Sequence, residues 1–210
     1  MDTPAIIASF AKRFGQPPKA IASAPGRLEV LGNHTDYNAG LTLSCAVGFR
    51  CAAAVSPLDE PTILLASTAF DTAPEKFPLS SPIAFAPPGH WANYALGIVA
   101  ALQQRGHRVP GFALLIDSDV PRSAGVSSSA ALEMALLTAL AGMVQLELTP
   151  VERARIGQWA ESNAVGAQTG LLDQLSSLRG ERDHLLHIDF RSLETRIVAL
   201  PPGWAFVAAD

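Results

Sequence analysis

A run of serines in the stretch DVPRSAGVSSSAALE, residues 119–133, stands where an apolar pattern predicts the start of a long helix. A helix start presents unpaired N–H groups and a partial positive charge, so small side chains there let a phosphate group approach the main chain. Gly125 permits backbone angles that larger residues resist, and the hydroxyls of the serines can donate to phosphate oxygens or ligate a magnesium ion. The pattern predicts an anion-binding loop, with an ordinary serine N-cap as the alternative.

Two common nucleotide loops are absent from the sequence. No Lys-Ser or Lys-Thr pair follows a glycine, so the serine stretch is not the phosphate loop of P-loop ATPases. No strand-linked G-x-G-x-x-G occurs, so the usual dinucleotide fingerprint is missing as well.

A second polar stretch, APGRLEVLGNHTDYNAG over residues 24–40, lies between apolar runs that predict strands. So many polar side chains between strands indicate a ligand site. The alternative is a polar turn in which His34, Asp36 and Asn38 make ordinary bonds from side chain to backbone.

A third stretch, ESNAVGAQTGLLDQLSS over residues 161–177, carries two carboxylates separated by a loop that contains glycine. Paired carboxylates can hold a metal ion or move a proton. A pair alone is weak evidence, and the alternative is a solvated Glu161 at a helix end with Asp173 as an N-cap.

These stretches must be positioned by the elements around them. Hydrophobic periodicity predicts helices over residues 4–14, 90–104, 127–144 and 150–163. Apolar, partly branched runs predict strands around residue 21 and over residues 28–31, 42–47, 51–55, 62–66, 111–118, 185–188, 196–199 and 205–208. Strands first and then mixed helices and strands favour an α+β two-layer domain over a strictly alternating doubly wound sheet.

The composition limits the classes of function. A chain of 210 residues that is 49% apolar suits one globular unit. A net charge of −4 without a long basic run argues against a nucleic-acid partner. No uncharged apolar window is long enough for a membrane span, and the N-terminal segment predicts an amphipathic helix, so we expect a soluble cytoplasmic protein without a membrane partner. Cys45 and Cys51 lie in apolar strand-like runs and are expected to be buried, reduced thiols.

The second stretch resembles, over nearly its whole length, the galactokinase signature Gly-Arg-x-Asn-x-Ile-Gly-Glu-His-Thr-Asp-Tyr-Asn. Galactokinases belong to the GHMP kinases, named after galactokinase, homoserine, mevalonate and phosphomevalonate kinases. The resemblance implies that Arg27 lies beside the transferring phosphoryl group and that Asn33, His34 and Asp36 hold sugar hydroxyls. Asn33 replaces the usual glutamate, and Glu29 the usual asparagine. Since an amide can donate as well as accept, Asn33 implies an altered hydroxyl pattern at one sugar position.

The serine stretch is similar to the ATP loop of the same family, whose usual form is Pro-x-Gly-x-Gly-Leu-Ser-Ser-Ser-Ala-Ala. The resemblance implies ATP phosphate contacts from one continuous run: Gly125, Val126, Ser127, Ser128, Ser129 and Ala130. Ser123 stands where a first glycine is usual, and Val126 stands where leucine is usual. The valine should matter little, whereas the added bulk of Ser123 implies a shifted loop or a weaker hold on the β- and γ-phosphates.

The third stretch matches the family element Gly-x-x-Asp-Gln, which has a glutamate twelve positions before its aspartate. By resemblance, Glu161 joins Ser129 as a Mg²⁺ ligand, Gly170 lies against the sugar, and Asp173 sits near the attacking hydroxyl. Phosphoryl transfer needs mainly positioning and charge neutralisation. Asp173 can accept or orient the hydroxyl proton while Arg27 keeps that carboxylate ionised. The choice between proton acceptance and orientation stays open.

Residues 89–97 also resemble the Trp-Ala-Asn-Tyr helix of galactokinases. Trp91 and Tyr94 could border an adenine, but aromatic residues at helical spacing are more often core, which is what we expect here. The resemblance spans nearly the whole chain and implies the two-layer α/β sandwich of the GHMP kinase N-terminal domain, of the ribosomal protein S5 domain 2 type. Family members run well beyond 210 residues. We therefore expect residues 1–210 to be that domain with the start of the domain junction, without the C-terminal domain.

Together these resemblances imply an ATP-dependent kinase of galactose metabolism, with ATP and Mg²⁺ as cofactors. The γ-phosphate would pass to the anomeric hydroxyl of galactose or a related hexose, aminosugar or uronic acid. One alternative is a sugar- and ATP-binding regulator without turnover, and another is an inactive fragment of such a kinase. The presence of Arg27, Glu161 and Asp173 argues against the regulator, which need not keep all three.

Overall fold

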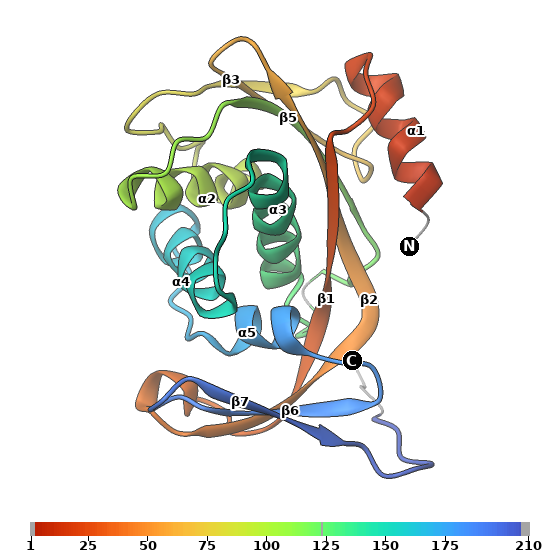
Figure 1. Ribbon diagram of the computed structural model, residues 1–210, viewed down its shortest axis with the longest axis vertical. Coiled ribbons are helices and arrows are strands. Elements are labelled where there is room, and N and C mark those ends of the chain that lie inside the picture. Colours follow the sequence, from red (N-terminus) through yellow and green to blue (C-terminus); the bar gives the residue numbers. More distant parts are fainter. Residues whose placement is uncertain (1–2, 123, 207–210) are drawn as a thin grey trace.

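The computed structural model describes residues 3–122 and 124–206, and in that part of the chain it has one mixed sheet (Figure 1). The sheet has seven strands, in the order β4-β3-β5-β2-β6-β7, with β1 paired to β2. The strands are β1 (Ala20–Leu31), β2 (Leu41–Leu58), β3 (Thr62–Ser67), β4 (Glu75–Pro78), β5 (Gly111–Ser118), β6 (His184–Asp189) and β7 (Glu194–Ala199). Only β3 and β5 pair in parallel among these described strands.

The long strand β2 organises the sheet. β1 pairs along one of its edges, while the other edge pairs with β6 at residues 41–44 and with β5 at residues 51–58. The register of β1 against β2 shifts between Pro25 and Arg27, and again between Glu29 and Leu31. Such irregularities re-aim side chains, and the first one lies immediately before Arg27.

Alternation along β2 divides its side chains between two cores, as the period of two in a strand requires. Cys51, Ala53 and Val55 belong to the larger core, and Ala52 and Ala54 belong to the smaller one. The sheet therefore buries side chains on both faces.

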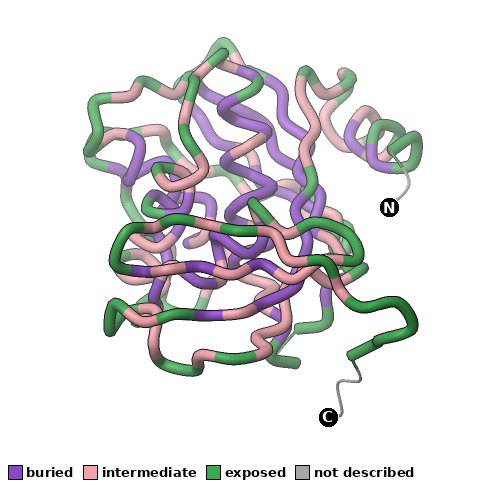
Figure 2. The backbone as a smooth tube through the Cα atoms, turned by 60° about the horizontal axis from the view of Figure 1, so that its bottom comes forward, coloured by how far each residue is buried: buried purple, intermediate pink, exposed green. Residues whose placement is uncertain are grey.

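Helices cover the two faces unequally (Figure 1). The larger core lies under a group of four helices: α2 (Ala92–Gln104), α3 (Ser128–Val144), α4 (Pro150–Ala160) and α5 (Leu172–Arg179). On the opposite face, α1 (Thr3–Phe14) buries Ile6 and Phe10 against the smaller core. Figure 2 shows that burial is concentrated in the central strands and in the helices packed on them, while residues 201–206 are exposed.

The predicted α+β sandwich is confirmed, and α1 adds a helix on the second face. The strands predicted near residue 21 and over residues 28–31 are one strand, because the register shifts disturb β1 without ending its pairing. Helix α5 and strand β4 were not predicted. The strand predicted over residues 205–208 is wrong at residues 205–206, which form none, and residues 207–210 lie outside the described residues.

Both thiols are free and buried, which confirms the expectation for Cys45 and Cys51. Burial raises the pKa of the Cys51 thiol to about 12, so this group stays protonated at neutral pH. Within residues 3–122 and 124–206, no helix combines the length and the apolar character that crossing a membrane needs. The cytoplasmic location stays a prediction.

Candidate active site

Arg27 in β1 and Asp173 in the first turn of α5 form an ion pair between segments 146 positions apart. Arg27 Nε donates to Asp173 Oδ1 at 2.8 Å, and Arg27 Nη2 lies 2.6 Å from the same oxygen. The two side chains are 13% and 21% exposed, so the pair is shielded from water but still reachable. The structure thus brings together the two residues that were predicted to act on one hydroxyl.

The other carboxylate oxygen of Asp173 is bound by the loop that opens α3. The Ser127 hydroxyl donates to Asp173 Oδ2. Ser127 has φ 52° and ψ 57°, a left-handed conformation that is uncommon for residues other than glycine and recurs at functional sites. The Ser127 hydroxyl is thus engaged by Asp173. Ser128 and Ser129, which were also predicted to bind phosphate, line the neighbouring cavity.

The serine loop is tied to β1. Arg27 Nη1 donates to the carbonyl of Gly125 at 2.8 Å, and the Arg27 backbone N–H donates to the carbonyl of Val126 at 3.1 Å. A Cβ at Gly26 would lie 2.5 Å from that Val126 oxygen, so only glycine allows this approach. Ala130 is buried in the first turn of α3, whereas Ser123 lies outside the described residues.

Asp36 and Gly170 lie against each other at the start of α5. A Cβ at Gly170 would collide with the Asp36 carboxylate, and the Leu172 N–H donates to Asp36 Oδ2 at 3.4 Å. Asp36 is therefore fixed beside the helix turn that carries Asp173. These are two of the four residues predicted to contact a sugar.

His34 and Asn33, the other two, lie in an exposed turn. The Tyr37 hydroxyl shares a hydrogen bond with His34 Nδ1, and Asn38 Nδ2 donates to the His34 carbonyl at 2.8 Å. These bonds are of the kind expected for an ordinary turn. In the described part of the chain neither His34 nor Asn33 hydrogen-bonds to Arg27 or Asp173, so their contact with a sugar stays a prediction.

Glu161 opens a π-helical turn (Glu161–Val165) directly after α4 and is only 4% exposed. Glu161 Oε2 accepts hydrogen bonds from Thr169 Oγ1 at 3.2 Å and from Gln174 Nε2 at 2.9 Å, and the Ser129 side chain is near enough to lower the pKa of Glu161. Burial raises the pKa of Glu161, and these hydrogen bonds oppose that rise. The two residues predicted to ligate Mg²⁺, Ser129 and Glu161, thus lie near each other.

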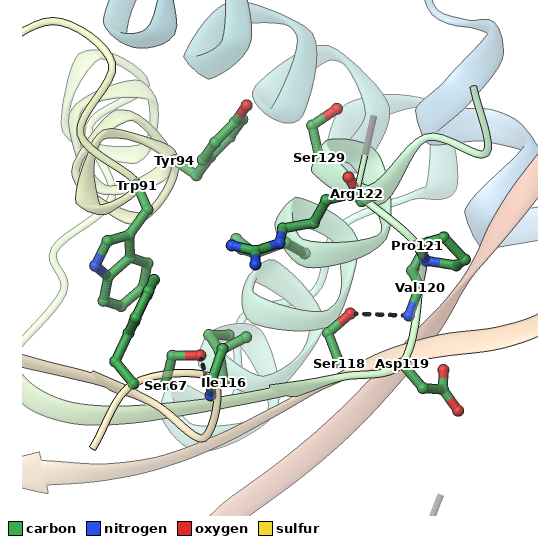
Figure 3. Close-up of a pocket in the computed structure, with 14 residues that line it drawn as sticks. Ser67, Trp91, Tyr94, Ile116, Ser118, Asp119, Val120, Pro121, Arg122 and Ser129 are labelled. Atoms are coloured by element: carbon green, nitrogen blue, oxygen red, sulfur yellow. Dashed lines mark hydrogen bonds between the residues drawn. The ribbon is translucent and has the colours of Figure 1, made fainter. Parts of the chain in front are cut away.

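A cavity of about 550 Å³ opens beside the start of α3 (Figure 3). Phe70, Trp91 and Tyr94 form an aromatic side of it, and Ser128 and Ser129 lie on the helix side. The cavity therefore joins an apolar wall to a helix N-terminus with free backbone donors.

Arg122 extends into the middle of this cavity, between Tyr94 and the end of β5 (Figure 3).

The core placement predicted for Trp91 and Tyr94 is only partly right. Trp91 packs against the larger core, yet both residues are half-buried and face the cavity. Trp91 Nε1 donates to Glu75 Oε1 at 3.0 Å, which holds the indole at the rim.

Two family models match the chain. Residues 8–57 match the galactokinase galactose-binding signature, and residues 93–181 match the GHMP kinases N terminal domain. The structure of Lactococcus lactis galactokinase complexed with galactose is similar with a TM-score of 0.85 and 28% identity, over 93% of this chain and 51% of that one. This chain is a galactokinase-like member of the GHMP kinase family.

Other solved structures share the fold of this galactokinase-like chain. Methanococcus jannaschii mevalonate kinase has a TM-score of 0.68 at 21% identity, over 84% of this chain and 54% of that one. A D-glycero-D-manno-heptose 1-phosphate kinase from Bacteriodes thetaiotaomicron has a TM-score of 0.69 at 17% identity, over 85% and 58%. The galactokinase-like chain therefore spans about half the length of the solved structures that it matches.

Two residues of the site in this galactokinase-like chain were missed from sequence, Gln174 and Thr169, which bind Glu161. Ser127 was predicted as a phosphate contact, but its bond to Asp173, made instead of a cap on its own helix, was not predicted. Gln174 stood inside the Gly-x-x-Asp-Gln element, so its position next to Asp173 was a signal that could have been used. No local pattern reveals the bond of Ser127, because its partner lies 46 positions away.

Proposed function

We propose that this galactokinase-like chain binds ATP, Mg²⁺ and a monosaccharide, and phosphorylates the anomeric hydroxyl of galactose or a related sugar. The observation that carries the proposal is the Arg27–Asp173 pair, which is joined through Ser127 to the N-terminus of α3. A helix of 17 residues aims its free N–H groups and positive dipole end at this point. A carboxylate, a guanidinium and an anion site thus adjoin, as phosphoryl transfer requires.

The cavity beside α3 suits a nucleotide. Its aromatic side, with Trp91 and Tyr94, offers an apolar surface for a purine, and its helix side offers backbone N–H groups and the hydroxyls of Ser128 and Ser129 for phosphates. The guanidinium of Arg122 adds positive charge within the same space.

Ser129 and Glu161 suit Mg²⁺. Glu161 is a buried carboxyl, and none of the ion pairs among the described residues includes it. A buried carboxylate without a cation is costly, so a divalent ion would supply the missing charge. Mg²⁺ commonly takes one or two protein oxygens together with substrate phosphates. When bound, the ion neutralises charge on the phosphate oxygens.

Asp173 and Arg27 then divide the chemistry at the hydroxyl. Arg27 holds Asp173 Oδ1 and offsets charge on the phosphoryl oxygens, while Asp173 Oδ2 receives the hydrogen bond of the sugar hydroxyl in exchange for that of Ser127. Asp36, fixed against Gly170 beside the same helix turn, orients the sugar. The exposed Asn33 contributes an amide where the family signature has a carboxylate. Since an amide can also donate, the substitution favours a sugar whose hydroxyl pattern differs from that of galactose at the position that Asn33 contacts.

We also propose that residues 1–210 correspond to the N-terminal domain of a GHMP kinase. The galactokinase match supports this assignment, because it covers 93% of this chain and 51% of the Lactococcus lactis chain.

The test combines binding and turnover. Wild-type protein should bind MgATP and at least one sugar from a panel of galactose, other hexoses, aminosugars and uronic acids in isothermal titration. Turnover should release ADP with that same sugar. Asp173→Asn should lower kcat by about 10²- to 10⁴-fold, the range of a general base, and leave the Kd for MgATP within about threefold.

Asp183→Asn is the matched control, because Asp183 is an exposed turn residue with φ 60°, a conformation that asparagine tolerates. Failure to bind MgATP and every sugar would contradict the proposal. Binding of both without ADP release would instead favour the sugar- and ATP-binding regulator.

A further inference from the structure

A single amide nitrogen joins two buried carboxyl groups behind the candidate active site. Gln174 Nε2 donates to Glu161 Oε2 at 2.9 Å and to Glu133 Oε2 at 3.2 Å. Both Gln174 and Glu133 are 0% exposed. The amide presents its nitrogen to this side, where oxygens of both carboxyl groups accept from it.

This bridge connects three helices. Glu133 lies in α3, Glu161 follows α4 and Gln174 lies in α5. Gly157 of α4 packs over the bridge, because a Cβ there would lie 3.0 Å from Glu133 Oε2 and 3.1 Å from Gln174 Cγ. The close packing leaves the Gln174 side chain little freedom to turn.

Two further oxygens of the bridge, Glu133 Oε1 and Gln174 Oε1, are buried without a hydrogen-bond partner among the described residues. None of the ion pairs in the described part of the chain includes Glu133. Buried polar atoms without a hydrogen-bond partner are rare in folded proteins, so each one calls for a structural or functional explanation. Glu133 therefore serves as a hydrogen-bonding group for the Gln174 amide, and a neutral amide could replace it.

We propose that Gln174 is a positioning residue that holds the Glu161 carboxylate toward Ser129 for Mg²⁺, and that Glu133 holds the Gln174 amide in place. This inference rests on the proposed function, because it assigns the bridge to the metal side of the nucleotide site. Partners that orient a metal ligand typically change metal affinity by about 10- to 100-fold when they are removed.

The experiment measures how much Mg²⁺ strengthens ATP binding. Isothermal titration of the full chain gives the Kd for ATP in EDTA and the Kd for MgATP, and their ratio is the magnesium enhancement. Gln174→Met, which keeps the side-chain length without the amide, should reduce that enhancement at least about tenfold, and Glu133→Met should do the same. Glu133→Gln should keep the enhancement within about threefold of wild type, because the oxygen of its amide can accept from Gln174 Nε2 as Glu133 Oε2 does.

Gln103→Met is the matched control, since the Gln103 amide donates to the Ser80 carbonyl in an exposed contact outside this bridge. An unchanged enhancement in Gln174→Met would overturn the inference alone. No enhancement in wild type would overturn both the inference and the proposed function. If circular dichroism shows that Gln174→Met is unfolded, Gln174→Asn, too short to span both carboxyls, replaces it with the same expected loss and the same contradicting result.

Discussion

At the scale of single residues, Asp173 has both carboxylate oxygens engaged. Arg27 binds Oδ1 with two nitrogens, while the neutral Ser127 hydroxyl binds Oδ2. Hydrogen bonds from a charged donor are about twice as strong as neutral ones, so under the proposed function Oδ2 is the oxygen that would exchange its hydrogen bond for one from the sugar hydroxyl.

Glu133 gives a pH prediction at the same scale. Burial raises its pKa well above the ordinary value of 4.5, and the nearby Glu161 adds to the rise. The folded protein therefore holds a proton there that the unfolded chain releases above that value, so the free energy of unfolding falls as pH rises. Glu133→Gln removes the titrating group, so the variant neither binds nor releases this proton when it unfolds. In urea titrations, the free energy of unfolding of Glu133→Gln relative to that of wild type should increase as the pH is raised above about 4.5.

Parallel stability curves for wild type and Glu133→Gln over that pH range would contradict the assigned proton. Glu194→Gln serves as the control, because Glu194 is exposed and its substitution should leave the two curves parallel.

At the scale of elements, α2 and α4 come together at Gly97. A Cβ on Gly97 would lie 2.8 Å from the Ala164 Cβ and 2.9 Å from the Ala160 Cβ. Ala160 immediately precedes Glu161, so this close contact also sets the position of the candidate metal ligand. Small residues at a helix crossing thus serve both packing and the site.

Gly97→Ala should therefore destabilise the protein by about 1–3 kcal/mol, the usual cost of overpacking a core. Gly142→Ala in α3 is the matched control, because its new Cβ would meet only the Ala20 Cβ at 4.0 Å. The control should stabilise the protein by about 0.5–1 kcal/mol through the better helix propensity of alanine. Urea unfolding compares the two, and equal midpoints would contradict the assigned contact.

At the scale of the whole molecule, the candidate site draws on segments spread along the chain. Arg27 comes from β1, Ser127 and Ser129 from the start of α3, Glu161 from the turn after α4, and Asp173 from α5. A ligand held by all of them favours the folded chain over every partly unfolded form.

MgATP at about 100 times its Kd should thus stabilise the fold by about 2.7 kcal/mol. For a chain of this size the melting temperature should rise by roughly 5–10 °C. Differential scanning calorimetry measures the rise, and ATP in EDTA should give a smaller one. A melting temperature that does not change in saturating MgATP would contradict the proposed nucleotide site.

Much of the local structure was predictable from the sequence. The bounds of β5 and α3 were predicted to within one residue, because their apolar runs are long and end in clear turn signals. β4 and α5 were not predicted, because the first is short and the second begins directly after a glycine loop without a capping side chain.

The sequence by itself determined which reactive groups the chain carries and that a serine run opens an apolar helix, because these features depend on neighbours a few residues apart. Only the tertiary structure decided that Arg27 reaches Asp173, that the Ser127 hydroxyl turns to Asp173, and that Gln174 bridges two buried carboxyls. Such contacts follow from how strands and helices pack, and packing joins side chains that no local pattern relates.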